Sequence, residues 1–110
     1  MPDGQHGKTI QVKVKLFGHL KQIAQQAVFD MESQAGSSVY EVIQAIAQRL
    51  GDDFRKALLE QSGNLHGGIE IVLNNEHLPA RRIRTIYISE DCELFIMPMI
   101  EGGLQSIEPK

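Results

Sequence analysis

The chain has 110 residues, a length that fits a single domain and leaves no room for a separate catalytic domain. Apolar residues make up 42% of it and charged residues 23%, a globular balance that excludes both a disordered segment and a membrane protein. The net charge of −3 also argues against a general nucleic-acid-binding protein, because such proteins usually carry a basic excess.

The chain carries no sign of a membrane or secretory destination. Its longest apolar runs are only a few residues, far short of the ~20 that cross a bilayer. The N-terminal residues 1–8 lack the apolar stretch of a secretory signal. Cys92 is the only cysteine, so no internal disulfide can form. We therefore expect a cytoplasmic protein without nucleic-acid or membrane partners.

The first third of the chain predicts a tail and two strands. Residues 1–8 are polar and glycine-rich, which predicts a flexible N-terminal tail. Apolar and polar residues alternate over 9–17, the pattern of a half-buried strand that Gly18 ends. A short helical turn or loop is expected over 19–26, and a second strand over 27–33. A short connection favours antiparallel pairing of the two strands.

The clearest predicted element is a helix over residues 39–50. Ser38 and Glu41 have the spacing of a capping box, in which each side chain bonds a free backbone N–H at a helix start. An apolar stripe then recurs at helical spacing, and its members are Val39, Val42, Ile43, Ile46 and Leu50. Gly51 fits the position that follows a helix.

A shorter helix is expected next, capped by Asp52 or Asp53. Its inner face would hold Phe54, Ala57 and Leu58, and residues 62–64 would end it.

The last third of the chain predicts three more strands. Residues 69–73 alternate, and Asn74-Asn75 suits a tight turn because asparagine tolerates left-handed backbone geometry. Residues 79–92 are less regular, with a short edge strand over 86–88. A final strand spans 93–98 and is apolar on both faces, which indicates either a central strand or a face left for a partner.

This element order favours an α+β fold in which one sheet packs against one principal helix. If the first and last strands pair side by side in parallel, the fold is a β-grasp. Periodicity alone does not fix that pairing, and a different α+β roll would give the same element order.

Four segments, in order and spacing, resemble the ubiquitin-like sulfur-carrier family (MoaD/ThiS type). This family includes the small subunit of molybdopterin synthase and the thiamine-pathway sulfur carrier. Residues 14–23 resemble its opening strand and Leu-containing turn, and residues 38–43 the start of its main helix. Residues 71–76 are similar to its strand and turn, and residues 93–103 to its closing strand, proline and diglycine. The resemblance covers roughly residues 9–103 and implies a ubiquitin-like β-grasp domain with a mixed sheet.

The resemblance implies a carrier rather than an enzyme. In the family the carboxylate of the terminal glycine attacks ATP inside a partner adenylyltransferase of the ubiquitin-activating type, and the acyl-adenylate becomes a thiocarboxylate. Gly103 would carry this chemistry, and Gly102 would help it to thread a narrow channel because glycine has no Cβ. The chain itself would bind no cofactor or metal, and ATP would be used by the partner. A large synthase subunit or a processing metalloprotease would be further partners.

The sequence departs from the family at its C-terminal end, because seven residues, 104–110, follow Gly103. With this extension attached, Gly103 has no free carboxylate. Two interpretations stay open. In one, a protease removes the extension, which its low apolar content would leave accessible. In the other, the domain has lost carrier chemistry and serves as a non-catalytic interaction module. A ubiquitin-like protein modifier is a further alternative, and it too would be active only after Gly103 is exposed. The sulfur-accepting pathway is equally open among molybdenum- or tungsten-cofactor, thiamine and cysteine synthesis and protein conjugation.

The resemblance also implies a docking surface. Phe17, His77 and Met97 match positions on the family's exposed sheet face, and Pro98 and Ile100 belong to the lead-in to the diglycine. An aromatic residue and a methionine suit a surface that meets several partners. Core packing explains Phe17 and Met97 equally well.

Three other groups of residues are weaker candidates. Cys92 has carboxylates on both sides, which should raise its pKa and disfavour a nucleophile. The histidines His6, His19, His66 and His77 lack metal-ligand spacing. Arg81, Arg82 and Arg84 would more readily form a solvated or partner-facing patch than a phosphate or nucleic-acid site.

Overall fold

A computed structural model describes residues 8–98 of the chain. No helix within this range is long and apolar enough to cross a membrane.

Strand β1 (Thr9–Leu16) forms as predicted, because each of its alternate apolar side chains enters the core. Strand β2 (Val28–Gln34) pairs with it in antiparallel fashion, with Val14 opposite Phe29. The prediction that the strand includes Phe17 is wrong. The backbone turns at Gly18, whose φ of +61° starts helix α1 (Gly18–Ala24), so Phe17 lies just before the helix.

Helix α2 (Val39–Leu50) has the predicted bounds and the predicted capping box. The Glu41 N–H donates to Ser38 Oγ at 3.0 Å, and the Ser38 N–H donates to Glu41 Oε1 at 2.8 Å. Its apolar stripe faces the core, where Val39, Val42, Ile43 and Ile46 are buried. The sequence therefore determines both the start and the orientation of this helix.

Helix α3 (Asp52–Leu58) follows, with Phe54 and Leu58 buried as predicted. The prediction that Asp52 or Asp53 caps it is wrong. Gly51 occupies the capping position, and no side chain bonds there. The Asp52 carboxylate accepts hydrogen bonds from Arg55 instead, at 3.0 and 3.1 Å.

Strands β4 (Ile69–Leu73) and β5 (Glu76–Leu78) form a hairpin. The turn residues Asn74 and Asn75 have φ values of +50° and +71°, as the sequence predicts. Strand β5 was not predicted, because three residues are too few for alternation to be recognised.

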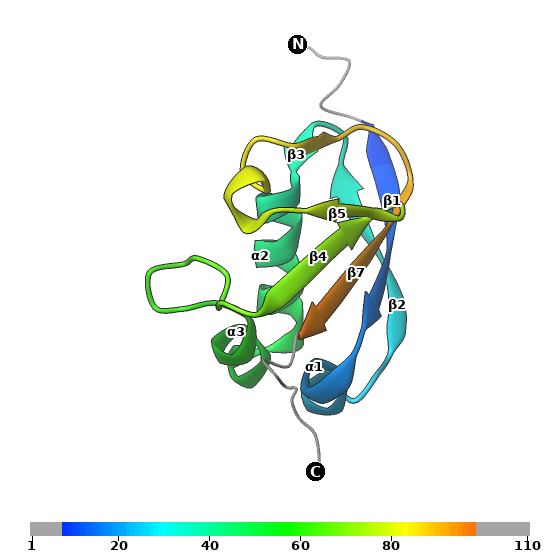
Figure 1. Ribbon diagram of the computed structural model, residues 1–110. Coiled ribbons are helices and arrows are strands. Elements are labelled where there is room, and N and C mark those ends of the chain that lie inside the picture. Colours follow the sequence, from blue (N-terminus) through cyan, green and yellow to red (C-terminus); the bar gives the residue numbers. More distant parts are fainter. Residues whose placement is uncertain (1–7, 99–110) are drawn as a thin grey trace.

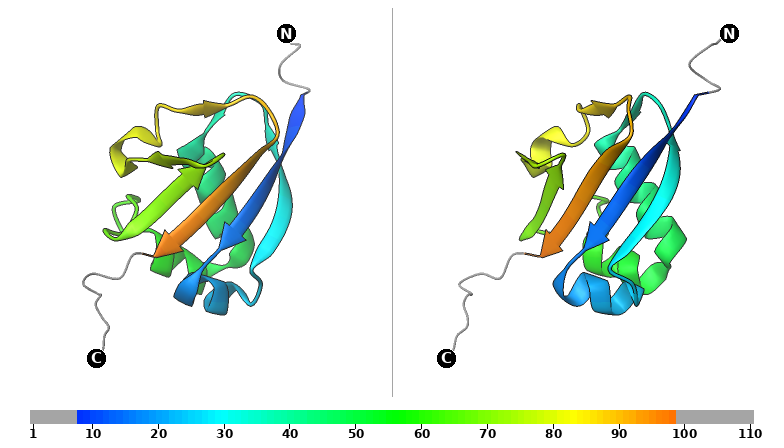
Figure 2. Two further views of the ribbon diagram at one scale, coloured as in Figure 1. Left: turned by 45° about the vertical axis from the view of Figure 1, so that its right-hand side comes forward. Right: turned by 90° about the vertical axis from the view of Figure 1, so that its right-hand side faces the viewer.

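The five-stranded sheet has the order β2-β1-β7-β4-β5 (Figure 1). Strand β7 (Cys92–Pro98) is central, parallel to β1 and antiparallel to β4. The parallel pairing of the first and last strands makes this a β-grasp fold and excludes the alternative α+β roll. Figure 2 shows helix α2 lying across one side of the sheet.

The segment between β5 and β7 differs from the prediction of a short edge strand over residues 86–88. Residues 86–88 do not lie at the edge of the main sheet. Strand β6 (Tyr87–Ile88) pairs instead with β3 (Ser37–Ser38) in a separate two-stranded sheet, after a 3₁₀ turn, η2 (Ala80–Arg82). The reason lies in the start of α2: the N–H groups of Val39 and Tyr40 donate to the carbonyls of Ile86 and Ile83, at 2.9 and 3.0 Å. The segment therefore satisfies helix donors that would otherwise lack partners.

Strand β2 forms one free edge of the main sheet, and an arginine from α2 covers part of it. The Leu16 N–H donates to Ala27 O, and the backbone groups of successive residues point to opposite sides of a strand. The backbone N–H and C=O of Asp30, three residues after Ala27, therefore point away from β1. Arg49 Nη1 donates to the Asp30 carbonyl at 3.2 Å, and its guanidinium lies 4.8 Å from the Phe29 ring centroid.

Candidate functional site

One face of the main sheet is not covered by the helices (Figure 2). We call it the outer face. Its side chains alternate along each strand with the buried residues that pack beneath α2. The outer face includes Phe17, just after β1, and the strand residues Lys13, Lys15, Val28, Asp30, Glu70, Val72, His77, Glu93, Phe95 and Met97.

An aromatic pair lies on the outer face, formed by Phe95 on the central strand β7 and Phe17 just after β1. The rings of Phe17 and Phe95 are tilted by 44°, with their centroids 5.7 Å apart. The ammonium group of Lys15 lies 5.1 Å from the Phe95 centroid, within range of a cation–π contact. Phe17 is 39% exposed and lies outside the core cluster, so the interpretation of Phe17 as a core residue is wrong.

An apolar row crosses the sheet from this pair. In the strand register Phe95 lies opposite Val72, and Val72 lies opposite His77 on β5. Val72 is only 8% exposed although it does not belong to the core cluster beneath the helices. At the other end of the row Val28 is 50% exposed. The outer face therefore presents apolar side chains on three of its five strands, β2, β7 and β4, and Phe17 adds another just after β1.

His77 and Met97 also lie on the outer face. His77 Nδ1 is 3.0 Å from Glu70 Oε1, and Glu70 lies opposite Met97 in the register. Met97 is half-buried and points away from the core cluster, so the interpretation of Met97 as a core residue is wrong. Phe17, His77 and Met97 thus share one surface.

Along the strands, the aromatic pair and Met97 gather at one end of the outer face. We call this end the apolar half, although it also carries Lys15 and Glu70. Towards the start of β7, Lys13 lies between Asp30 and Glu93 in the register. Towards its end lie Phe95 and Met97, and the chain leaves the sheet at Pro98. The apolar half is therefore next to the exit of the C-terminal segment.

Pro98 is the last described residue of the predicted site. It is half-buried and packs against Gly18 at the turn between β1 and α1. Ile100, Gly102 and Gly103 lie outside the described residues, as do residues 1–7 and the extension over 104–110.

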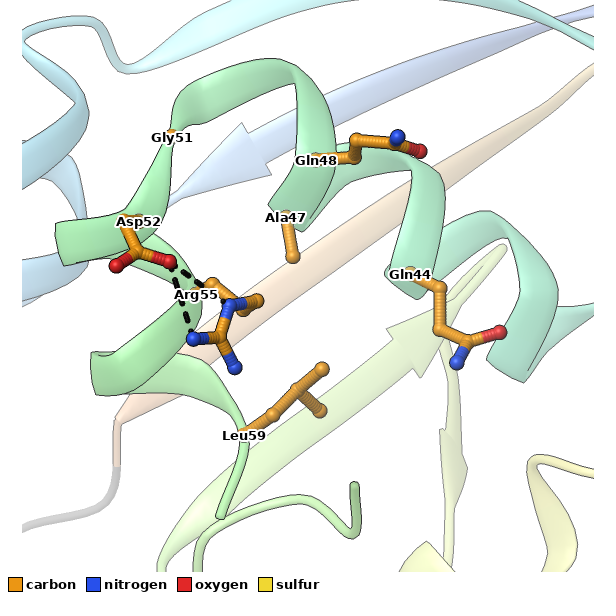
Figure 3. A pocket seen from close by; sticks show the side chains of 7 residues that line it. All are labelled: Gln44, Ala47, Gln48, Gly51, Asp52, Arg55 and Leu59. Carbon is orange, nitrogen blue, oxygen red and sulfur yellow. Dashed lines mark hydrogen bonds and ion pairs between the residues drawn. The ribbon is translucent and has the colours of Figure 1, made fainter. Parts of the chain in front are cut away.

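A groove of about 530 Å³ lies on the helical side of the molecule, between α2 and α3 (Figure 3). Its lining is Gln44, Ala47, Gln48, Gly51, Asp52, Arg55 and Leu59. Arg55 and Asp52 bind each other, and this pairing lowers the pKa of Asp52. Because its two charged groups neutralise each other, this groove has no unpaired charge with which to bind an ion.

The weaker candidates have structural partners. Burial, and then the charge of Asp91, raises the pKa of the Cys92 thiol, a direction that disfavours a nucleophile. Arg81, Arg82 and Arg84 are all exposed, and Arg84 lies 3.8 Å from the Tyr40 ring centroid and donates to Asn64 Oδ1 at 3.0 Å. Within residues 8–98 no three metal-binding side chains come together.

Sequence reasoning missed Val72, Lys15 and Glu70 as members of this surface. It placed Phe95 with Met97 on one face of the last strand but did not name Phe95 as a docking residue. The signal for Phe95 was present, since it alternates with Leu94 and Ile96 and shares a face with Met97. Lys15 and Glu70 carried no signal of their own, because an exposed charge on a strand is ordinary.

Solved structures share this fold. Small archaeal modifier protein 1 from Methanosarcina acetivorans is 22% identical, with a TM-score of 0.71 over 88% of this chain and 100% of that one. Urm1 from Trypanosoma brucei is 14% identical, with a TM-score of 0.69 over 88% and 99%. A chain of the Amycolatopsis orientalis BexX/CysO complex is 22% identical, with a TM-score of 0.57 over 84% and 99%. At these identities the likeness shows the fold alone.

The sequence comparisons are more specific. Among curated proteins, no sequence matches this chain. The profile of the ThiS family matches residues 14–103, which include every helix of the structure, the central strand β7 and the diglycine. The match ends at Gly103, and residues 104–110 lie beyond it. The chain therefore belongs to the ThiS family of ubiquitin-like sulfur carriers.

Proposed function

We propose that this chain is a cytoplasmic sulfur carrier that becomes active when residues 104–110 are removed. One observation carries the proposal: the family match ends at Gly103, the second residue of a diglycine that follows the central strand. Removal of the extension would give Gly103 a free carboxylate at the position where the family ends.

The proposed chemistry needs no catalytic group on this chain. The Gly103 carboxylate attacks the α-phosphate of ATP, which releases pyrophosphate and leaves an acyl-adenylate. A sulfide then attacks the acyl carbon and displaces AMP, which leaves a thiocarboxylate. The oxygen lost from the carboxylate departs with AMP. A partner adenylyltransferase of the ubiquitin-activating type would bind ATP and supply the catalysis, so the carrier would contribute only its reactive end and a docking surface.

The outer face is the surface best suited to docking that enzyme. Its apolar half exposes an aromatic pair and a methionine, residue types that are enriched at protein interfaces. It also lies beside the exit of the chain at Pro98. An enzyme that binds this half would hold the C-terminal segment close by.

A direct experiment tests the carrier chemistry. The chain ending at Gly103 keeps every described strand and helix. Incubated with ATP, sulfide and the adenylyltransferase of the native host, it should gain the mass difference between one sulfur and one oxygen. The full chain of 110 residues is the matched control and should gain nothing. Absence of adenylate and thiocarboxylate on the trimmed chain would contradict the proposal.

A second experiment tests the docking surface. Phe17→Ala should raise the KM of the adenylyltransferase for the carrier by about tenfold, because truncating an aromatic anchor at an interface typically costs more than ~1 kcal/mol. Tyr87→Ala is the control: Tyr87 is 63% exposed but lies on β6, in the separate sheet. Equal effects of the two substitutions on KM would exclude the outer face as the docking site.

A non-catalytic interaction module or a protein modifier is the second candidate function. The observation in favour of the module is the extension itself, which the family match does not cover. The module predicts that chains purified from the native host retain Lys110 and work with Gly103→Ala. The modifier predicts Gly103 joined to lysines of other proteins. Intact mass and peptide mapping of host material separate these outcomes from a free end at Gly103.

The acceptor of the sulfur is a finer question. The neighbours include a complex named BexX/CysO and a small archaeal modifier protein, and the same chemical end would serve both. A large synthase subunit is one partner that the family suggests, and a processing metalloprotease would account for removal of the extension. Genes beside this one would separate cofactor, thiamine and cysteine synthesis.

A further inference from the structure

The point where β7 leaves the sheet depends on a glycine in a different element. The parallel register places Leu16 opposite Ile96, and two residues further on Gly18 comes opposite Pro98. A Cβ placed on Gly18 would lie 2.8 Å from Pro98 Cγ and 3.5 Å from Pro98 Cδ. A proline ring has little freedom to move aside. The missing side chain of Gly18 is thus the space that the Pro98 ring needs.

The proline also ends the hydrogen-bonded ladder at this point. In the continued register, the N–H of residue 98 would donate to the carbonyl of Phe17. Proline has no N–H, and the Phe17 carbonyl accepts instead from the Lys21 N–H at 3.4 Å, at the start of α1. β1 and β7 therefore separate at one defined level, where the Pro98 ring packs against Gly18.

From these contacts we propose that Gly18 is a positioning residue for the C-terminal segment. By giving room to the Pro98 ring, it fixes where the chain leaves the sheet, and so where Gly103 is delivered relative to a partner bound on the outer face. This role rests on the proposed carrier function. Phe17, the docking aromatic, is adjacent to Gly18 in sequence, so the docking surface and the exit are held by the same turn.

The structure provides a matched control for Gly18→Ala. Gly18 has a φ of +61° and Gly36 has a φ of +94°, so alanine strains the backbone at either position. A Cβ at Gly36 would meet no atom within 4 Å, whereas a Cβ at Gly18 would meet Pro98. Gly36 follows β2, away from the exit. The pair separates backbone strain from displacement of the proline.

Adenylation kinetics test the proposal with the chain ending at Gly103. Misplacement of a reacting group by about 1 Å can cost on the order of 10²-fold in rate, so Gly18→Ala should lower kcat by about tenfold or more. The KM should stay within about twofold, because Gly18→Ala removes no side chain from the docking surface. Gly36→Ala should leave both constants within about twofold of the wild type. Equal kcat values for the two variants would overturn the proposal.

A second-site substitution tests the mechanism. Pro98→Ala removes the Cγ that the new methyl group would meet, so adding Gly18→Ala to Pro98→Ala should lower kcat no further. If Gly18→Ala lowers kcat by the same factor in both backgrounds, the proline is not its target and the proposal fails.

A structural measurement separates this proposal from the carrier function. In the full chain, Gly18→Ala should speed amide hydrogen exchange of Met97 and Glu70, which face each other at the end of the β4–β7 pair, relative to Val12 in β1. Gly36→Ala should not change this ratio. If the wild-type trimmed chain is never adenylated, the carrier function fails, and this exchange ratio still tests whether Gly18 fixes the point where β7 leaves the sheet. An unchanged ratio in Gly18→Ala would overturn the proposal.

Discussion

At the scale of single residues, Cys92 shows how the fold suppresses a reactive group. Its side chain is half-buried against the core at the start of β7, next to Asp91. Removal from water disfavours the thiolate, and the neighbouring carboxylate disfavours it further, so the pKa is raised. The sequence predicts this direction from the carboxylates alone. The larger cause, burial, follows from the position of the strand in the sheet.

We expect Cys92 to react slowly with iodoacetamide, with a half-maximal rate above pH 9.0, the ordinary pKa of the group. The same shift affects stability. Because the folded-state pKa is raised, its contribution to the free energy of unfolding is complete below pH 9.0 and is lost as the pH rises through the folded-state value. Alkylation rates between pH 7 and pH 11 check the raised pKa of the thiol, with the urea-unfolded chain as the reference. A native half-maximum at or below the unfolded one would contradict it.

At the scale of elements, helix α2 is held at its start by three independent acceptors. Ser38 Oγ accepts from the Glu41 N–H, while the carbonyls of Ile86 and Ile83 accept from the two preceding donors, the N–H groups of Val39 and Tyr40. The first acceptor is local in sequence and could be predicted. The other two come from more than forty residues away, and no local pattern announces them.

Ser38→Ala should lower the free energy of unfolding by about 1 kcal/mol, the usual loss for an N-cap hydroxyl. Ser38 is the one residue classed as buried and polar within residues 8–98. Its removal leaves the Glu41 N–H without its acceptor, so the loss of the hydroxyl is destabilising although the site is buried. Urea unfolding measures the loss. Ser89→Ala, an exposed change in a loop, should stay within about 0.5 kcal/mol of the wild type. A loss no larger than that control would show that the capping box is dispensable.

The same contrast explains how much of the fold and site the sequence predicts. Helix α2 and strand β1 carry many periodic positions each, so their pattern is clear. Strands β3, β5 and β6 have two or three residues, and only their distant partners define them. The predicted docking residues Phe17, His77 and Met97 do share a face, whereas Glu70 and Val72 become part of it only through strand register. Gly103 stays a prediction.

At the scale of the whole molecule, the main sheet has two free edges, and each carries a feature that limits pairing with another strand. β5 has only three residues and is followed by Pro79, which lacks an N–H. β2 has seven residues, and Arg49 occupies the Asp30 carbonyl in its middle. The outer face is thus open to a partner while the edges beside it discourage pairing with a second copy.

Arg49→Ala should expose that carbonyl and increase the fraction of dimer in sedimentation velocity at high protein concentration. The free energy of unfolding should change by about 0.5 kcal/mol or less, as for other exposed side chains. Arg55→Ala, on α3, removes an exposed arginine that does not touch the edge and should leave the chain monomeric. Dimer formation by both variants, or by neither, would contradict a role for Arg49 at the edge.

The contact between Arg49 and Asp30 has a wider consequence for a small protein that keeps apolar side chains in water. An exposed apolar sheet face does not by itself lead to fibrils. Fibrils also need a sheet edge whose free backbone N–H and C=O groups can pair with a strand of an identical chain. Because Arg49 occupies the Asp30 carbonyl, the outer face stays available to a different protein while growth of a sheet from identical chains is disfavoured at this edge.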